Sequence, residues 1–205
     1  MATLAEHVGD ELIDAELVEL DEADARVSGA YLEDVRIARC ALPRLALDGS
    51  ELFACTFTDC DLSMLSLLDT SLREVRFVGC RLVGIDWTVA AWPSISSGDT
   101  VVFERCTLDV GTFADLDLRD TAFTGSSARE VDFADAVLSG ADLSGTDLTS
   151  ANFNRTDLRG ADLTGATNAA IDFSSNQVAG ARFDVTGALA LLAPLGIEIV
   201  TQPAE

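Results

Sequence analysis

Large apolar residues recur at every fifth position along most of the chain. A first series begins at Leu12 and ends at Trp87, and 15 of its 16 members are large and apolar. A second series begins at Phe103 and ends at Phe183, shifted by one position, and 15 of its 17 members are large and apolar. A period of five matches neither the turn of an α-helix nor the two-residue alternation of a flat strand. The pattern therefore predicts a repeat architecture.

Small residues occupy the position two residues before each large one. Examples are Cys40, Cys60 and Cys80 in the first series and Ala141 and Ala161 in the second. The residue between the small and the large one is usually polar, so the three residues alternate inward, outward, inward, as in an extended segment. The two remaining residues of each pentad are often Ser, Thr, Arg, Asp or Gly, which favour a corner.

The phenylalanines indicate how many pentads complete one coil. Phe113, Phe133, Phe153 and Phe173 are spaced by twenty residues, so four pentads make one coil. Like residues then stack along the axis at about 4.8 Å, where each backbone amide can bond to the coil above or below. The sequence predicts an all-β, four-sided parallel β-helix of about eight coils, a rod roughly 40 Å long.

An insertion interrupts the repeat at residues 88–102, where the series breaks and its phase shifts. Trp87, Trp92 and Pro93 cluster there, and two interpretations stay open. The tryptophans could cover the seam where register is lost, or the segment could be a protruding loop that contacts a partner.

The repeat ends in a short capping helix. Residues 186–193 (TGALALLA) predict this helix, with Thr186 as its N-cap and Gly196 beyond its end. The expected organisation is an N-terminal segment (1–11), a β-helix (12–185) with its insertion, and a C-terminal cap and tail (186–205).

The net charge of the chain indicates which class of partner it can bind. The 13 basic residues, all of them arginine, compare with 35 acidic residues, which gives a net charge of −22. Such a chain repels nucleic-acid phosphates and anionic lipid headgroups, so we expect a basic protein partner and no direct binding of nucleic acid or membrane. No export signal is recognisable, and no apolar stretch reaches the roughly 18 residues of a membrane-spanning helix. We therefore expect a cytoplasmic protein whose five cysteines are reduced.

Groups for catalysis are scarce in the sequence. The single histidine, His7, precedes the repeat, so one chain cannot assemble a histidine-centred triad or a paired-histidine metal site. All five cysteines occupy small inward positions, where sulfur acts as an apolar filler. Asn168 occupies a large inward position and is expected to bond exposed backbone at a distorted coil. The sequence predicts a protein without enzymatic activity, cofactor or metal.

The consensus of the repeat is clearest in GADLSGTDLTSANFNRTDLRGADLTGA (140–166). This stretch resembles the pentapeptide-repeat family, and the resemblance extends over about residues 12–185. The segments RLVGIDWT (81–88), NAAIDFSSNQVAGARFD (168–184) and GALALLAPLGIEIV (187–200) are similar to the quinolone-resistance (Qnr-type) branch of that family.

The resemblance carries expectations for fold, assembly and target. It implies a right-handed quadrilateral β-helix that forms a homodimer through its C-terminal cap and acts as a DNA mimic on DNA gyrase or topoisomerase IV. In this chain the dimer contact would fall on Leu189, Leu192, Leu195 and Ile197. The partner loop would be the insertion at 88–102, with Trp87, Trp92 and Pro93.

Acidic residues are the candidates for a DNA-mimicking surface. Thirteen of the 35 lie at the outward position of a pentad, so the repeat alone does not account for the charge. Averaged over the rod, the net charge is about one per 1.8 Å, close to the value of duplex DNA. The predicted partner-binding residues are Asp142 with Asp162, and Asp115 with Asp135 and their neighbour Asp132. The alternative is an acidic interaction scaffold for an unrelated protein target, in which charge serves solubility.

Overall fold

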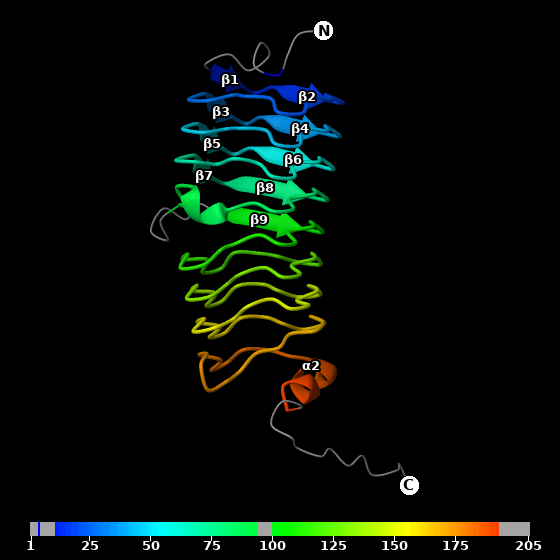
Figure 1. Cartoon of the computed structure of the whole chain (residues 1–205), viewed down its shortest axis with the longest axis vertical. Helices are drawn as coiled ribbons and strands as arrows, with labels where there is room; N and C mark the ends of the chain where they lie inside the picture. The colour runs from blue at the N-terminus through cyan, green and yellow to red at the C-terminus, as the bar shows by residue number, and fades with distance from the viewer. Residues whose placement is uncertain (1–3, 5–10, 94–99, 193–205) are drawn as a thin grey trace.

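The computed structural model describes residue 4 and residues 11–93 and 100–192, which form a rod of stacked coils (Figure 1). Strand pairing defines two of its four walls. Wall 1 contains the strands β1 (Glu11–Ile13), β3 (Tyr31–Glu33), β5 (Glu51–Phe53) and β7 (Ser71–Arg73). Wall 2 contains β2 (Glu16–Val18), β4 (Arg36–Ala38), β6 (Thr56–Thr58), β8 (Val75–Val78) and β9 (Val101–Glu104). Walls 3 and 4 are built from single parallel bridges, such as Asp21 with Ala41 and Arg26 with Ala46.

The register between coils is constant except at the insertion. Paired residues are twenty apart, as for Leu12 with Leu32 on wall 1. Phe77 on β8 instead pairs with Phe103 on β9, an offset of 26. Since Ala91 still pairs with Ser71, six additional residues are accommodated after it. This offset accounts for the one-position phase shift between the two series of the sequence.

Wall 2 gives the extent of the stack. Nine residues pair in one continuous column along it: Glu16, Arg36, Thr56, Arg76, Val102, Ala122, Asp142, Asp162 and Arg182. The ninth level is incomplete because the chain leaves it for a helix, so the count differs slightly from the predicted eight coils. The predicted fold class, an all-β parallel β-helix with a short C-terminal helix, is confirmed.

Outward aspartates occur where a wall is a single bridge and not where it is a strand. An Asp at this position accepts a hydrogen bond from the N–H two residues later, as Asp142 does from Ser144 (2.9 Å) and Asp162 from Thr164 (2.9 Å). The bond turns the chain directly after the bridge. All nine three- or four-residue strands lack Asp or Asn at this position. Glu11, Glu16 and Glu51 occupy it instead, and a glutamate is one methylene longer.

Stacked aromatic rings fill much of the interior. Phe113 stacks on Phe133 and Phe133 on Phe153, with ring centroids 5.5 and 5.3 Å apart. A second column lines wall 2, with centroids 5.0 to 5.5 Å apart: Phe57, Phe77, Phe103 and Phe123. The prediction that Phe173 continues the first column is wrong. Its side chain is 36% exposed and contacts no ring of the described residues, because its segment leaves wall 4.

Cysteines form a column of their own. Cys40, Cys60, Cys80 and Cys106 lie one per coil, and all five cysteines are free and buried, as predicted. The Cys60 thiol donates to the carbonyls of Thr58 (3.3 Å) and Ile37 (3.4 Å). On another wall, burial raises the pKa of the Cys55 thiol to about 11, so it stays protonated at neutral pH. A protonated, buried thiol is a structural filler and not a nucleophile.

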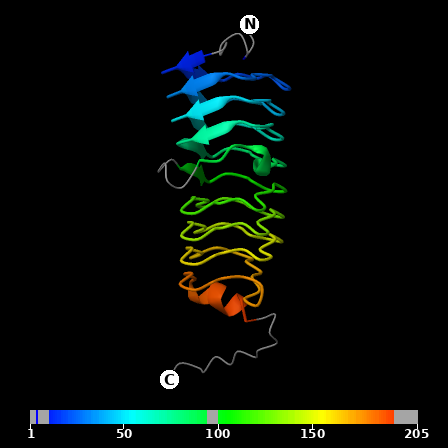
Figure 2. The same cartoon turned by 90° about the vertical axis from the view of Figure 1, so that its left-hand side faces the viewer.

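The helix α2 (Val185–Ala190) lies across the last coil in both views (Figures 1 and 2). The prediction of Thr186 as N-cap is wrong. The cap is Asp184, whose Oδ1 accepts from the N–H of Gly187 (2.7 Å), while its Oδ2 accepts from the N–H of Gly165 (3.1 Å). The Asp184 carboxylate therefore accepts one hydrogen bond from the first turn of the helix and one from the backbone N–H of Gly165 in the preceding coil. Gly196, Leu195 and Ile197 lie outside the described residues.

Candidate functional site

The corners of the rod display side chains to solvent in regular columns. Nearly every pentad turns at a residue with positive φ, between 47° at Asp14 and 77° at Gly180. At the corner between walls 4 and 1, the coils place Asp69, Asp115, Asp135 and Arg155 at this turning position. Aspartate tolerates this left-handed backbone because its short side chain can bond locally. Polar corner columns thus follow from backbone geometry as well as from function.

The five predicted partner-binding aspartates do not form one patch. Asp142 and Asp162 are paired neighbours on wall 2, and Asp132 lies on wall 4. Asp115 and Asp135 follow wall 4 at its corner with wall 1. Because ten residues correspond to half a coil, Asp132 and Asp142 lie on opposite walls. The predicted set is therefore split into two groups that no single flat surface could contact together.

Hydrogen bonds distinguish the roles of these carboxylates. Asp132, like Asp142 and Asp162, accepts from a backbone N–H two residues later and so holds its turn. Arg155 donates to Asp135 through two hydrogen bonds (2.6 and 2.5 Å), and these hold the pKa of that carboxyl below its usual value. Asp115 is exposed, and its carboxylate makes no hydrogen bond or ion pair with any described residue.

Arginines are unevenly placed around the rod. We define the acidic edge as walls 4 and 1 with their shared corner, and the opposite edge as walls 2 and 3 with theirs. The acidic edge carries eleven acids: Asp48, Asp69, Asp86, Asp115, Asp132, Asp135, Glu11, Glu33, Glu51, Asp117 and Asp157. It carries three arginines, Arg26, Arg73 and Arg155. The opposite edge carries nine acids: Glu16, Glu19, Asp21, Asp59, Asp61, Glu104, Asp142, Asp147 and Asp162. Six arginines accompany these: Arg36, Arg39, Arg76, Arg81, Arg105 and Arg182.

Ion pairs reduce the charge of part of the acidic edge. Arginines neutralise Asp117, Asp135 and Asp157 there. Five aspartates of this edge take part in none of the ion pairs among the described residues: Asp48, Asp69, Asp86, Asp115 and Asp132. Asp48 and Asp69 were not among the sequence candidates, although counting charges corner by corner would have found them. Four aspartates of the opposite edge, Asp21, Asp59, Asp61 and Asp142, are also outside the ion pairs among the described residues, but Arg36, Arg81 and Arg105 on the same edge offset their charge. The net negative charge is therefore larger on walls 4 and 1.

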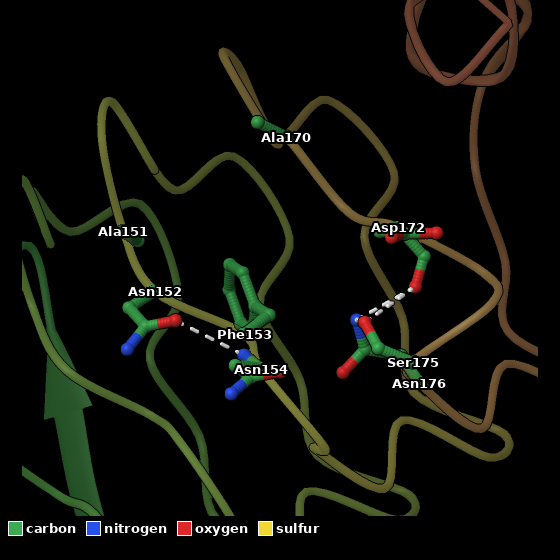
Figure 3. Close-up of a pocket in the computed structure, with 8 residues that line it drawn as sticks. All are labelled: Ala151, Asn152, Phe153, Asn154, Ala170, Asp172, Ser175 and Asn176. Carbon is green, nitrogen blue, oxygen red and sulfur yellow. Dashed lines mark hydrogen bonds between the residues drawn. The ribbon is translucent and has the colours of Figure 1, made fainter. Parts of the chain in front are cut away.

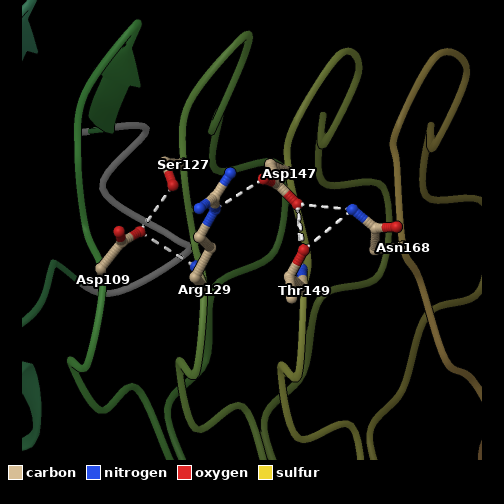
Figure 4. Close-up of polar contacts among 6 residues, drawn as sticks. All are labelled: Asp109, Ser127, Arg129, Asp147, Thr149 and Asn168. Atoms are coloured by element: carbon tan, nitrogen blue, oxygen red, sulfur yellow. Dashed lines mark hydrogen bonds and ion pairs between the residues drawn. The ribbon is translucent and has the colours of Figure 1, made fainter.

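Wall 3 illustrates the opposite case, where an aspartate is engaged by its surroundings (Figure 4). Asp147 accepts from the Thr149 hydroxyl (2.6 Å), from Asn168 (3.0 Å) and from Arg129 (2.7 Å), and these contacts lower its pKa. Asn168 was expected to bond backbone groups, and this was wrong: its amide bonds the side chains of Asp147 and Thr149 (2.8 Å). The residue turns outward because its backbone has a positive φ.

The tryptophans lie at the seam. Trp87 is fully buried and stacks on Phe113 with centroids 5.3 Å apart. Trp92 is partly buried, and its indole N–H donates to the carbonyl of Trp87 (2.8 Å). These contacts favour the seam interpretation for both rings and leave Trp87 inaccessible to a partner. Pro93, which is also partly buried, precedes a segment outside the described residues.

The helix end presents apolar side chains to solvent. Val185 is 76% and Leu189 39% exposed, while Leu191 is buried. Leu192, at the end of the described residues, is intermediate in exposure. Leu189 and Leu192 are the two predicted dimer-contact residues that the structure places, and both are accessible in part.

The described residues contain no group of three or more histidine, cysteine, aspartate or glutamate side chains arranged to hold a metal ion. Within the same residues, no helix has the length and apolar character needed to cross a membrane. His7 lies outside them. The geometry so described offers surfaces for contact and no assembled set of reactive groups.

Comparison with known proteins agrees with this architecture. The family model for pentapeptide repeats matches eight copies within residues 50–86, 117–155 and 129–165. The matches cover residues 50–86 and 117–165, so these parts of the chain are built from pentapeptide repeats. No curated protein gives a significant sequence match.

Solved structures of QnrB1, a plasmid-mediated fluoroquinolone resistance protein, share the fold. One trypsin-treated variant aligns with a TM-score of 0.69 at 18% identity and covers 93% of this chain and 100% of its own. Another aligns with a TM-score of 0.59 at 21% identity and covers 95% and 93%. At these identities the likeness extends to the fold, and it spans nearly the whole length of both chains.

Proposed function

We propose that this protein is a non-enzymatic DNA mimic that binds a type II topoisomerase, such as DNA gyrase, through its acidic edge. The observation that carries the proposal is the group of uncompensated aspartates on wall 4 (Asp86 and Asp132) and at its corner with wall 1 (Asp48, Asp69 and Asp115), while arginines offset much of the charge of the opposite edge. A one-sided anionic rod complements a basic groove that normally holds duplex DNA. The shared fold with a fluoroquinolone resistance protein supports the proposal.

A bound rod of this kind would compete with DNA. It would slow supercoiling, or release the enzyme from drug-trapped cleavage complexes and so protect against quinolones. No step requires a reactive side chain, because occupancy of the groove is sufficient.

The second candidate is an acidic scaffold for an unrelated basic protein. The observation that favours it is structural: many outward aspartates hold turns, so part of the charge serves the fold. Both candidates predict a basic partner and a salt-sensitive complex, and they differ in its identity.

The proposed assembly is a homodimer joined at the C-terminal cap. Exposed Val185 and Leu189 on α2 support a contact there, which would include Leu192 and the predicted residues Leu195 and Ile197. Sedimentation equilibrium of the full chain and of Leu189→Glu tests it. A dimer that the substitution dissociates agrees with the proposal, and a wild-type monomer contradicts it.

The decisive experiment titrates the protein into gyrase supercoiling and quinolone-cleavage reactions. One variant carries Asn at Asp69, Asp115 and Asp132 on the acidic edge. The matched control carries Asn at Asp21, Asp59 and Asp142 on the opposite edge. Each removes three charges from residues outside the ion pairs, and Asn preserves the turn at Asp132 and Asp142, as Asn152 does at its own (3.1 Å to the N–H of Asn154).

We expect the acidic-edge variant to lose most of its effect on gyrase and the control to keep it. Equal losses would mean that only total charge matters and would reject a specific edge. Absence of any effect by the wild-type protein at micromolar concentration would reject the topoisomerase target and leave the scaffold.

A further inference from the structure

On wall 4 the ladder between coils ends one coil early. Bridges connect Thr112 with Asp132 and Asp132 with Asn152, but Asn152 has no bridge to Asp172. The chain has the correct length for that bridge. Bridges before and after the segment, Asp147 with Thr167 and Asp157 with Gln177, both keep the offset of twenty. Residues 168–176 therefore bow away from a wall that they are long enough to complete.

The departure leaves backbone groups open. One coil earlier, the N–H of Phe133 donates to the carbonyl of Asn152 (2.9 Å), and the carbonyl of Val131 accepts from the N–H of Asn152 (2.9 Å). The corresponding groups of the next coil have no hydrogen-bond partner among the described residues: the carbonyl of Ala151 and the N–H groups of Phe153 and Arg155. In chain order these groups are one acceptor followed by two donors. An unpaired edge of this kind can form parallel β-bridges with one more extended segment.

A cavity of about 270 Å³ lies between this edge and the bowed segment (Figure 3). Its polar side chains are those of Asn152 and Asn154 on one side and Asp172, Ser175 and Asn176 on the other. Amides and hydroxyls of this kind can bond the polar backbone of a peptide, whereas they would disfavour a purely apolar ligand.

The bowed segment is held by its own hydrogen bonds. The carbonyl of Asp172, which would accept from Phe153 in a regular coil, accepts instead from Asn176 Nδ2 (2.8 Å) and the Ser175 hydroxyl (3.3 Å). Asn176 Oδ1 in turn accepts from the N–H of Thr156 (2.8 Å). Residues 172–176 thus use, in hydrogen bonds among themselves and to Thr156, the carbonyl of Asp172 that would otherwise bond Phe153 in the missing bridge.

Charge at the opening favours a basic occupant. Ser174 donates to Asp172, and this lowers the pKa of that carboxyl, so it is ionised at neutral pH. Asp132 lies on wall 4 next to Asn152, one coil before the open position. The arginine of the open stretch, Arg155, is already paired with Asp135. A lysine or arginine of an incoming segment would therefore meet negative charge that is not neutralised.

We propose that this open position on wall 4 binds an extended peptide segment of a protein partner, which adds a rung to the wall and places a lysine or arginine beside Asp172. Main-chain hydrogen bonds to residues 151–155 would supply affinity, and the basic side chain would supply selectivity. This site is separate from α2 and does not depend on the identity of the partner that binds the acidic edge.

Two synthetic heptapeptides serve as probes. SAKFNRT copies residues 150–156 with Lys at the position of Asn152, and SAEFNRT carries Glu there. Each is titrated into the full chain, with affinity measured by calorimetry and amide exchange followed by NMR. We expect the Lys peptide to bind more tightly by about fivefold, the scale of one exposed ion pair. The peptide should slow exchange of the Phe153 and Arg155 amides.

Variants locate the binding. Asp172→Asn should abolish the preference for Lys over Glu. Ala170→Phe, which fills the cavity, should abolish binding of both peptides, whereas Ala179→Phe at an exposed position on another corner should not. Binding by the Ala170→Phe variant, or absence of binding by wild type, would overturn the proposal. Protection of the Phe153 and Arg155 amides without peptide would also overturn it, since residues 170–174 would then close the gap themselves.

Discussion

The first five levels of the rod and the last four share one interior but differ on the outside. Within the first five, walls 1 and 2 carry strands of three or four residues, and the outward positions of these strands hold Glu, Arg, Thr, Ser, Tyr or Val. Beyond β9 every described pairing is a single bridge, and Asp or Asn at the outward position accepts from the turn that follows it. The inside of a pentapeptide coil sets the fold, whereas the outward residue sets how its turns are held.

The two regions also differ in how many of their carboxylates are engaged in hydrogen bonds and ion pairs. Lowered aspartate pKa values gather in the second region, at Asp135, Asp147, Asp157, Asp162 and Asp172, with Asp24 as the example in the first. Many carboxylates of the second region are therefore structural, and free carboxylates such as Asp69 and Asp115 are the better candidates for contact with a partner.

Replacing a phenylalanine of an aromatic column by alanine should lower the free energy of unfolding more than any other change proposed here. The loss should be equal in the two regions. Phe77→Ala and Phe133→Ala each remove a buried ring stacked on both sides, and each should lower the free energy of unfolding by about 3–5 kcal/mol. Urea denaturation measures both. A twofold difference between them would show that the interiors are not equivalent.

Removing an outward side chain should separate the regions. Asp147→Ala loses hydrogen bonds to Thr149, Asn168 and Arg129 and should cost roughly 1.5–3 kcal/mol. Thr56→Ala, at the outward position of β6, should cost less than about 0.5 kcal/mol, as for an ordinary surface substitution. Equal costs would contradict the role of aspartate in the turn.

Exchanging valine and glycine at two corner positions should change the stability of the protein in opposite directions. Val110 is 60% exposed and has φ of +62°, which is strained for a β-branched residue, so Val110→Gly should stabilise by about 1 kcal/mol. Gly145→Val places the same side chain at φ of +67° and should destabilise by a similar amount. Thermal denaturation of the two variants tests the sign.

Acid should weaken the second region first, and by the smallest amount per group, because the arginine partners of these aspartates are largely exposed. The folded pKa values of Asp135, Asp157 and Asp162 lie below the unfolded value near 4. Their contribution is therefore complete above that pH and is lost as pH falls through the folded values. Hydrogen exchange at pH 3 and pH 7, analysed coil by coil, should show the larger loss of protection after residue 117. A uniform loss would contradict the assignment.

Much of the fold could be predicted because the repeat is periodic. Like residues twenty apart must stack, so Leu12 over Leu32 and Phe113 over Phe133 follow from spacing alone. The candidate site was harder. Spacing paired Asp142 with Asp162 and grouped Asp132 with Asp115 and Asp135, as in the structure. It did not show that Arg155 neutralises Asp135, since the direction of a long side chain depends on its neighbours.

The sequence by itself determined the coil, its period and the side of each wall on which a residue lies, because hydrophobic burial acts identically at every repeat. Tertiary structure alone decided the ends and the exceptions. Phe173 satisfies the period yet lies outside the stack, and Asp184 instead of Thr186 caps the helix. At these places no further coil follows, so local hydrogen bonds compete with the ladder and win.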